Sequence, residues 1–206
     1  MSEDPLAFLE LPVPPGFLPY RSSWVGWRGA YGDHHHRALS LRASGDDLSG
    51  LTQLPADGLW LLNVRHRNVT DAGFDLICRF DGLEELDLTG TRITDAAARA
   101  MHTMQSLRVL SLSGCAITDV AMEHVAALRG LEHLDLSATQ VTDDGLRALA
   151  FHPNLRVLIL RDSAVSGRAL APLLLLKHLR QVGLNHHQHR NAHQFIREHP
   201  EVEILY

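Results

Sequence analysis

The sequence has few of the features that mark secreted, nucleic-acid-binding or membrane-spanning proteins. It contains 2 cysteines in 206 residues. They occupy different positions of the pattern described below, so we expect no disulfide and favour a reducing cytoplasm. Asp and Glu (24) outnumber Lys and Arg (19), and the formal net charge of −5 argues against a nucleic-acid partner, which would need a basic face. No apolar run approaches the roughly 20 residues that span a bilayer, and the N-terminus lacks the basic head of a signal peptide.

Motifs of the common enzyme classes are also missing. The chain has no glycine-rich phosphate loop, no H-E-x-x-H metal motif and no G-x-S-x-G nucleophile elbow. No residue set forms a recognisable catalytic group. We therefore predict no cofactor and no enzymatic activity.

What the sequence does have is one pattern, written three times without a gap. It reads LEELDLTGTRITD from residue 83, LRVLSLSGCAITD from residue 107 and LEHLDLSATQVTD from residue 131, so the copies start 24 residues apart. Steps of the same length reach Leu59 on one side and Leu155 and Leu179 on the other. Six units in one register predict a solenoid, because a single short unit cannot bury its own apolar faces.

Each unit predicts a short strand followed by a short helix. Leu86 and Leu88 alternate with polar residues, which is typical of a strand with one buried face. The Thr-Asp pair at 94–95, like its equivalents at 118–119 and 142–143, supplies side-chain oxygens for the free N–H groups of a helix start. The predicted buried stripes of the helices are Ala98, Met101 and Met104, then Met122, Val125 and Leu128, then Leu146 and Leu149. The predicted partners of the turn backbone are Thr91, Cys115, Thr139 and Ser163.

The consensus L-x-x-L-x-L-x-x-T/C-x-I/V-T-D resembles the leucine-rich repeat, in the Thr-Asp form common in bacterial proteins and similar to the repeats of F-box-type receptors. The resemblance covers residues 59–190. It implies an α/β fold, a right-handed leucine-rich-repeat solenoid or horseshoe arc with a parallel concave sheet and short convex helices. It also implies a protein-binding role, which is usual for such solenoids.

The ends of the chain depart from the repeat, within what we predict to be one single domain. Residues 1–58 are expected to form an N-terminal cap with a degenerate repeat at Leu39 and Leu41, and residues 191–206 a C-terminal cap helix and strand. Prolines interrupt residues 1–20. Two interpretations stay open for that segment: it docks on its own chain, or it docks on a partner.

The outward positions of the strands carry the candidate binding site. An acidic centre with neighbouring apolar side chains is typical of an interface core with a polar rim. The candidate partner-binding residues are Glu85, Asp87, Val109, His133, Asp135, Val157, Ile159 and Arg161. They predict a protein partner with a basic face and an apolar anchor, and neither nucleic acid nor a membrane. Asp87 and Asp135, about 10 Å apart across two strand spacings, could also form an acid/base set with His133, but a solvated acidic patch is the simpler interpretation.

A second column alternates in charge from unit to unit. It contains Glu84, Arg108, Glu132 and Arg156. Opposite charges one strand apart are expected to form a ladder of surface ion pairs rather than a recognition stripe.

The 14 histidines suggest a different class of function. Residues 34–36 are all histidine, and His186, His187, His189 and His193 crowd the last repeat. His189 and His193 are four residues apart, a spacing that places two imidazoles on one helix face and could support a metal site. The leading prediction is a non-enzymatic protein–protein interaction module. The alternatives are a metal-binding protein using the four C-terminal histidines, and a substrate-receptor or adaptor subunit, although residues 1–58 show no helical adaptor box.

Overall fold

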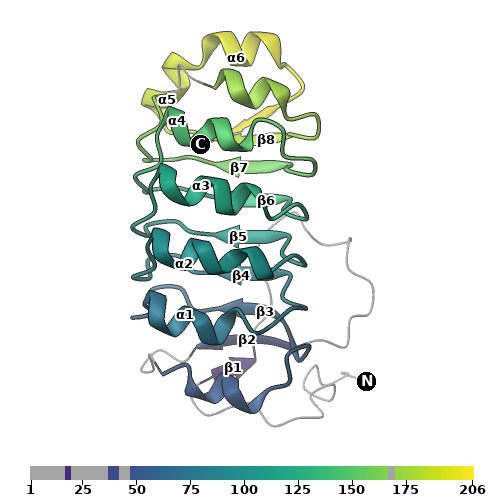
Figure 1. Ribbon diagram of the computed structural model, residues 1–206. Coiled ribbons are helices and arrows are strands. Elements are labelled where there is room, and N and C mark those ends of the chain that lie inside the picture. The colour runs from purple at the N-terminus through teal and green to yellow at the C-terminus, as the bar shows by residue number, and fades with distance from the viewer. Residues whose placement is uncertain (1–16, 20–36, 42–46, 167–169) are drawn as a thin grey trace, which may run out of the picture.

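The computed structural model describes residues 17–19, 37–41, 47–166 and 170–206, and within these it forms a stack of strand–helix units (Figure 1). The histidines at 34–36 and most of residues 1–20 lie outside the described residues. One sheet runs through the described chain in the order β1 to β9. Its strands are β1 (Phe17–Pro19), β2 (Arg37–Leu41), β3 (Leu59–Asn63), β4 (Glu85–Asp87), β5 (Val109–Ser111), β6 (His133–Asp135), β7 (Val157–Ile159), β8 (Gln181–Gly183) and β9 (Glu203–Leu205). β1 pairs with β2 antiparallel, and every later pairing is parallel.

The helices form a second layer along one face of the sheet (Figure 1). They are α1 (Asp71–Ile77), α2 (Asp95–Ala100), α3 (Asp119–Ala126), α4 (Asp143–Leu146), α5 (His186–Asn191) and α6 (His193–Glu198). Short 3-10 turns accompany them at η1 (Ser49–Gln53), η2 (Met101–Thr103), η3 (Arg147–Leu149) and η4 (Ala171–Leu175). α1 contacts α2, α2 contacts α3, and α3 contacts α4. The predicted α/β leucine-rich-repeat solenoid, with its parallel sheet, is confirmed.

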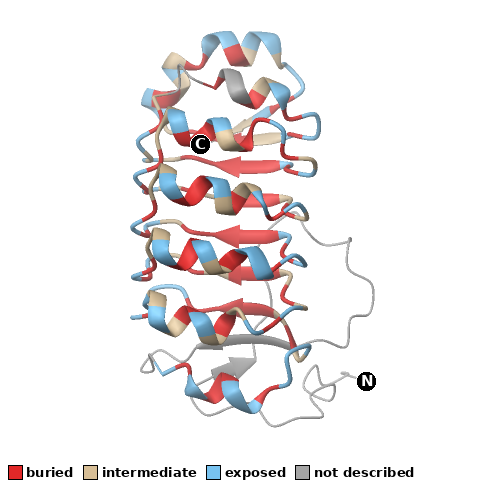
Figure 2. Ribbon diagram, viewed as in Figure 1, coloured by how far each residue is buried: buried red, intermediate tan, exposed pale blue. Residues whose placement is uncertain are grey.

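The hydrophobic core lies between the sheet and the helices (Figure 2). The central leucines of β4 to β7, which are Leu86, Leu110, Leu134 and Leu158, are each at most 1% exposed. Strand register explains this, because Leu86 pairs with Leu110 and Leu110 pairs with Leu134, so one leucine follows another along the stack. All residues of the predicted helix stripes are buried in the same cluster.

The Thr-Asp pairs act differently from what the sequence suggested. The threonines cap their own helices, as expected: the Thr94 hydroxyl accepts from the Ala96 N–H at 3.2 Å. The aspartates reach the next repeat instead. Asp95 accepts from the Thr118 N–H at 2.9 Å and from the Thr118 hydroxyl at 2.6 Å. The expectation that Asp95 caps its own helix is therefore wrong, because its carboxylate is used between repeats.

The same double hydrogen bond recurs along the stack. We call these contacts the Asp–Thr ladder; it joins Asp71 to Thr94, Asp95 to Thr118, Asp119 to Thr142 and Asp143 to Ser166. Hydrogen bonds to an ionised carboxylate are the strong kind, worth about 1.5–3 kcal/mol each. The ladder therefore fixes how one repeat stacks on the next.

The turns that follow the strands are held in two ways. Thr91, Thr139 and Ser163 donate their hydroxyls to carbonyl oxygens within their own turns at 2.6–2.7 Å, as predicted. Cys115 donates its thiol to the Leu88 carbonyl of the preceding repeat, and like Cys78 it is a free cysteine. In the described part of the chain, no helix is long and apolar enough to cross a bilayer.

One position of each turn lies in the left-handed backbone region. It is occupied by His66, Gly90, Gly114, Ala138 and Asp162, with φ between 52° and 68°. Glycine takes this conformation without strain, whereas a residue with a Cβ pays roughly 1–2 kcal/mol. Ala138 has no polar side chain with which to offset that cost.

The described ends of the stack depart from the 24-residue repeat. In the N-terminal part, Leu39 of β2 pairs with Leu62 of β3, and Leu48, Leu51 and Leu54 are buried. In the C-terminal part, Phe195 of α6 is buried and β9 pairs with β8.

Candidate functional site

The outward side chains of β3 to β8 form the surface opposite the helices, which we call the helix-free face. They belong to two columns that alternate with the core leucines. The columns are Leu61, Glu85, Val109, His133, Val157 and Gln181, and Asn63, Asp87, Ser111, Asp135, Ile159 and Gly183. The register therefore brings seven of the eight predicted contact residues onto one surface, with Arg161 just beyond the end of β7.

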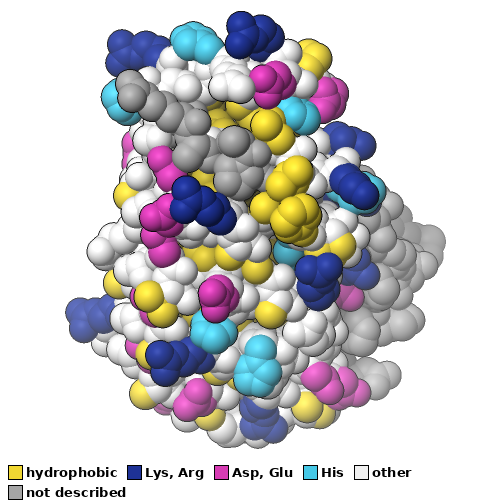
Figure 3. All heavy atoms as spheres, turned by 45° about the horizontal axis from the view of Figure 1, so that its top comes forward, with side chains coloured by type: hydrophobic (Ala, Val, Ile, Leu, Met, Phe, Trp, Pro, Cys, Tyr) yellow, Lys and Arg dark blue, Asp and Glu magenta, His cyan; other side chains and the backbone are white. Residues whose placement is uncertain are grey.

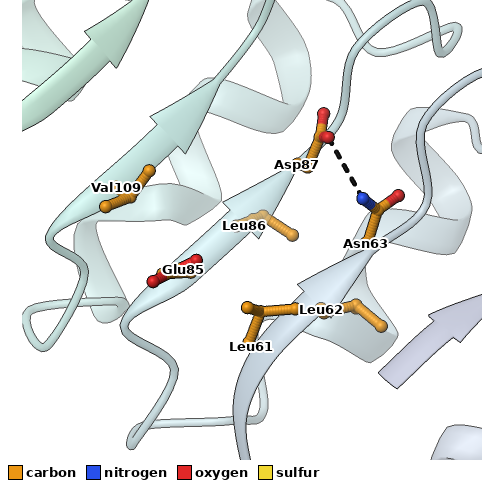
Figure 4. Close-up of a pocket in the computed structure, with 7 residues that line it drawn as sticks. All are labelled: Leu61, Leu62, Asn63, Glu85, Leu86, Asp87 and Val109. Carbon is orange, nitrogen blue, oxygen red and sulfur yellow. Dashed lines mark hydrogen bonds between the residues drawn. The ribbon is translucent and has the colours of Figure 1, made fainter. Parts of the chain in front are cut away.

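Asp87 and Asp135 are held by the turns that follow their own strands. The Thr89 N–H donates to Asp87 Oδ1 at 3.0 Å, and the Ser137 N–H donates to Asp135 Oδ1 at 2.8 Å. Asn63 occupies the same column and donates to Asp87 Oδ2 at 3.2 Å (Figure 4). The column therefore has a structural function at strand ends, which the sequence reasoning missed. Asp and Asn side chains often accept a hydrogen bond from the backbone N–H two residues further on, and the presence of Asp or Asn at the end of a strand could have revealed this function.

Exposure divides the predicted contacts into two groups. Asp87, Asp135 and Arg161 are partly exposed. The other five are at most 8% exposed; they are Glu85, Val109, His133, Val157 and Ile159. The valines and Ile159 lie outside the main core cluster, although they are buried. In this structure only the first group has substantial contact with solvent.

His133 is a neutral imidazole at physiological pH. Burial, and to a lesser degree the nearby Arg156 guanidinium, together lower its pKa to about 4. A general base works best with a pKa near the working pH, so an imidazole with this pKa is a weak proton acceptor at neutral pH. The strand bearing Ser111 separates Asp87 from Asp135. This arrangement favours an acidic recognition patch over an acid/base set.

One hollow on this face is too small for a small-molecule ligand. It is lined by Leu61, Leu62, Asn63, Glu85, Leu86, Asp87 and Val109, and its volume is about 10 Å³ (Figure 4). That is room for a single water molecule.

Arg161 is hydrogen-bonded to the C-terminal residue of the described chain. One of its terminal nitrogens donates to the Tyr206 carbonyl oxygen at 2.8 Å. It therefore lies at the edge of the helix-free face, beside β9, rather than over its centre.

The C-terminal histidines gather around an aromatic ring. His186 stacks on Tyr206 at 5.6 Å between ring centroids, and His189 meets the same ring edge-on at 5.2 Å. His193 lies 6.4 Å from His189, and His187 is exposed. Within the described residues, no three side chains of His, Cys, Asp or Glu are placed to hold a metal ion.

The alternating charged column is an ion-pair ladder, as predicted. Arg108 lies 2.9 Å from Glu132 and 3.5 Å from Glu84, and Arg156 lies 3.1 Å from Glu132. These charges neutralise one another at the surface. The acidic patch therefore consists of Asp87 and Asp135 on the helix-free face.

Comparisons with known proteins agree with this architecture. A family model described as leucine rich repeat matches residues 81–141. An internalin (inlF) of Listeria monocytogenes has a similar structure, with a TM-score of 0.58, 18% identity and coverage of 77% of this chain. This chain spans 44% of the length of that internalin, so the likeness concerns the fold. An internalin C2 (inlC2) of the same species gives a TM-score of 0.47 at 22% identity, covering 72% of this chain and 71% of that one. A search of curated proteins finds no match.

The family model covers the three clearest repeats, and the structure extends the same register from β3 to β8. The structural likeness to inlF covers most of the chain. The chain therefore carries leucine-rich repeats and has the fold of a leucine-rich-repeat solenoid.

Proposed function

We propose that this protein is a non-enzymatic interaction module that binds a basic protein partner on the helix-free face of its sheet. The observation that carries the proposal is the fixed placement of Asp87 and Asp135, which share one column with one strand between them. Each carboxylate is partly exposed and held by its own turn. A partner meets groups that are already ordered, so binding costs little side-chain entropy.

Charge supports a basic partner. In the described structure Asp135 Oδ2 has no hydrogen-bond partner, so it is available to a Lys or Arg side chain. Exposed charges of this kind speed association and fix register, and salt screens them. Binding through this column should therefore weaken as ionic strength rises.

The apolar residues of the helix-free face are buried, so an apolar side chain of the partner can contact them only after they become exposed. Val109, Val157 and Ile159 are 1%, 7% and 8% exposed, so they contribute only if binding brings them to the surface. A partner that touches Asp87, Asp135 and Arg161 alone would bind weakly. Tight binding requires a change that exposes the apolar members as the partner docks.

The proposal assigns no chemistry to the site. Leucine-rich repeat folds generally serve as interaction scaffolds, and His133 is a poor base at neutral pH for the reason given above. We further propose a reducing, cytoplasmic setting, because Cys78 and Cys115 are free thiols.

The test compares two doubly neutralised variants in a pull-down from the native organism, quantified by mass spectrometry. Asp87→Asn with Asp135→Asn removes both charges while keeping an oxygen that accepts the turn N–H. Asp75→Asn with Glu123→Gln removes two exposed charges from helices α1 and α3 and serves as the matched control. Retained proteins are then purified and their affinities measured by calorimetry at low and high salt.

We expect the partner of the wild-type protein to bind the first variant roughly tenfold more weakly, because two exposed charge pairs are worth about 1–2 kcal/mol together. The control should bind like the wild type. If the partner binds both variants with the same affinity, the binding site does not lie on this face. Ile159→Thr tests the apolar members separately, since threonine is also β-branched and keeps the strand.

A further inference from the structure

A second surface differs from the helix-free face in both position and charge. It lies where the helical layer turns back toward the sheet. Phe151 follows η3 and is 75% exposed, and Leu175 ends η4 and is 47% exposed. The two residues are one 24-residue unit apart, and η3 contacts η4. Figure 3 shows hydrophobic side chains gathered on this side of the molecule, with Lys, Arg and His side chains beside them.

The repeat itself does not require apolar residues at this position. Earlier units place Arg79, Thr103 and Ala127 there, all exposed. Arg79 donates to the Leu54 carbonyl at 3.3 Å, and Thr103 donates to the Ala100 carbonyl at 3.1 Å. Phe151 and Leu175 can make no such bond. A large apolar side chain left in water forgoes the roughly 1.5–3 kcal/mol that its burial would contribute, so a partner that covered these two residues would gain from burying them.

The neighbouring loops add positive charge. Arg129 and Lys177 belong to one loop column, and both are exposed. In the described structure neither makes an ion pair. The loop after Phe151 is tied to the loop bearing Arg129, because the Asn154 side-chain amide donates to the Arg129 carbonyl at 2.8 Å. The same column also holds the acidic residues Asp81, two units before Arg129, and Glu201, which is bonded to His199 at 2.8 Å.

We propose that Phe151, Leu175, Arg129 and Lys177 form a docking surface for an acidic protein segment that carries a large apolar side chain. The apolar side chain packs on Phe151 and Leu175, and flanking carboxylates pair with Arg129 and Lys177. Exposed apolar residues rimmed by polar or charged ones mark interaction sites. This partner has the opposite charge to the one proposed for the helix-free face, so the two surfaces select different molecules.

The experiment uses arrays of short synthetic peptides in which one Phe or Leu is flanked by Asp and Glu at varied spacings. A matched array carries Lys in place of every acid. Binding of the full chain is measured on both arrays, and hits are confirmed by fluorescence anisotropy at low and high salt. The variants are Phe151→Ser with Leu175→Ser, and Arg129→Glu with Lys177→Glu. Val120→Ser is the control, because Val120 is also apolar and 58% exposed but lies on α3.

We expect acidic peptides to bind the wild type and the control equally, and the serine variant at least tenfold more weakly. The glutamate variant should prefer the lysine array. Unchanged circular dichroism and thermal unfolding show that each variant folds. Equal binding to both arrays, no binding to either, or full binding by the serine variant would overturn the proposal. Self-association of the wild type that disappears in the serine variant would also overturn it, because the surface would then join two copies of this chain. Asp87→Asn with Asp135→Asn should leave binding to the acidic array unchanged, so failure here is distinguishable from failure of the helix-free face.

Discussion

Acid should destabilise this protein in part through His133. The pKa of His133 is lowered from 6.5 to about 4 in the folded state by burial and by Arg156. Above pH 6.5 the imidazole is neutral in both the folded and unfolded states and contributes no pH dependence. Between pH 6.5 and about 4 the unfolded chain binds a proton that the folded chain does not bind, so stability falls as pH falls. Each pKa unit is worth 1.36 kcal/mol, so the loss over this window is about 3 kcal/mol.

The assay is urea unfolding followed by tryptophan fluorescence at a series of pH values from 7 to 4. His133→Val is the test variant, because Val109 and Val157 occupy the same column in the neighbouring strands. Its free energy of unfolding should fall by about 3 kcal/mol less than that of the wild type over the same pH range. His187→Gln is the control, because His187 is exposed. Parallel pH profiles for wild type and His133→Val would refute the reasoning, whatever the difference in stability at pH 7.

Three further outcomes follow from the repeat. Asp119→Ala should lower the free energy of unfolding by about 2–4 kcal/mol, because it removes both hydrogen bonds to Thr142; a loss below 1 kcal/mol in urea unfolding would contradict the role of the Asp–Thr ladder. Ala138→Gly should raise the free energy of unfolding by about 0.5–1 kcal/mol, because φ is 52° there, and destabilisation would argue against strain. Native Cys78 and Cys115 should resist thiol reagents and react only on unfolding, because burial raises the pKa of both thiols, that of Cys78 to about 12; rapid native labelling would be the contrary result.

The sequence predicted those parts of the fold that follow from periodicity. A period of 24 residues places Leu86, Leu110 and Leu134 in one register, and alternation within each strand assigns Asp87 and Asp135 to the opposite face. The oppositely charged column at Arg108 and its neighbours was predictable for the same reason. These properties depend only on spacing.

Periodicity could not predict contacts that depend on how repeats stack. Asp95 follows a helix-capping threonine, so local chemistry assigns it to its own helix. Its actual partner, Thr118, is 23 residues away and comes into reach only when the next unit packs alongside. The burial of Val157 and Ile159 was not visible for a related reason. The alternation of side chains along a strand indicates which face a residue occupies. The exposed fraction of that residue depends instead on the neighbouring side chains and segments that pack around it.

The two proposed surfaces are possible because some positions of the repeat stabilise the stack and others are free to vary. Stacking is provided by the core leucines and by the Asp–Thr ladder, whose positions recur in nearly every unit. Positions outside that framework vary without loss of the fold: the position of Phe151 holds Arg79 in an earlier unit, and that of Asp135 holds Ile159 in a later one. A solenoid stabilised between neighbouring units can therefore carry different side chains on each face. An acidic patch on the sheet and a basic-rimmed apolar patch beside the helices can then coexist in one small protein, each with its own partner.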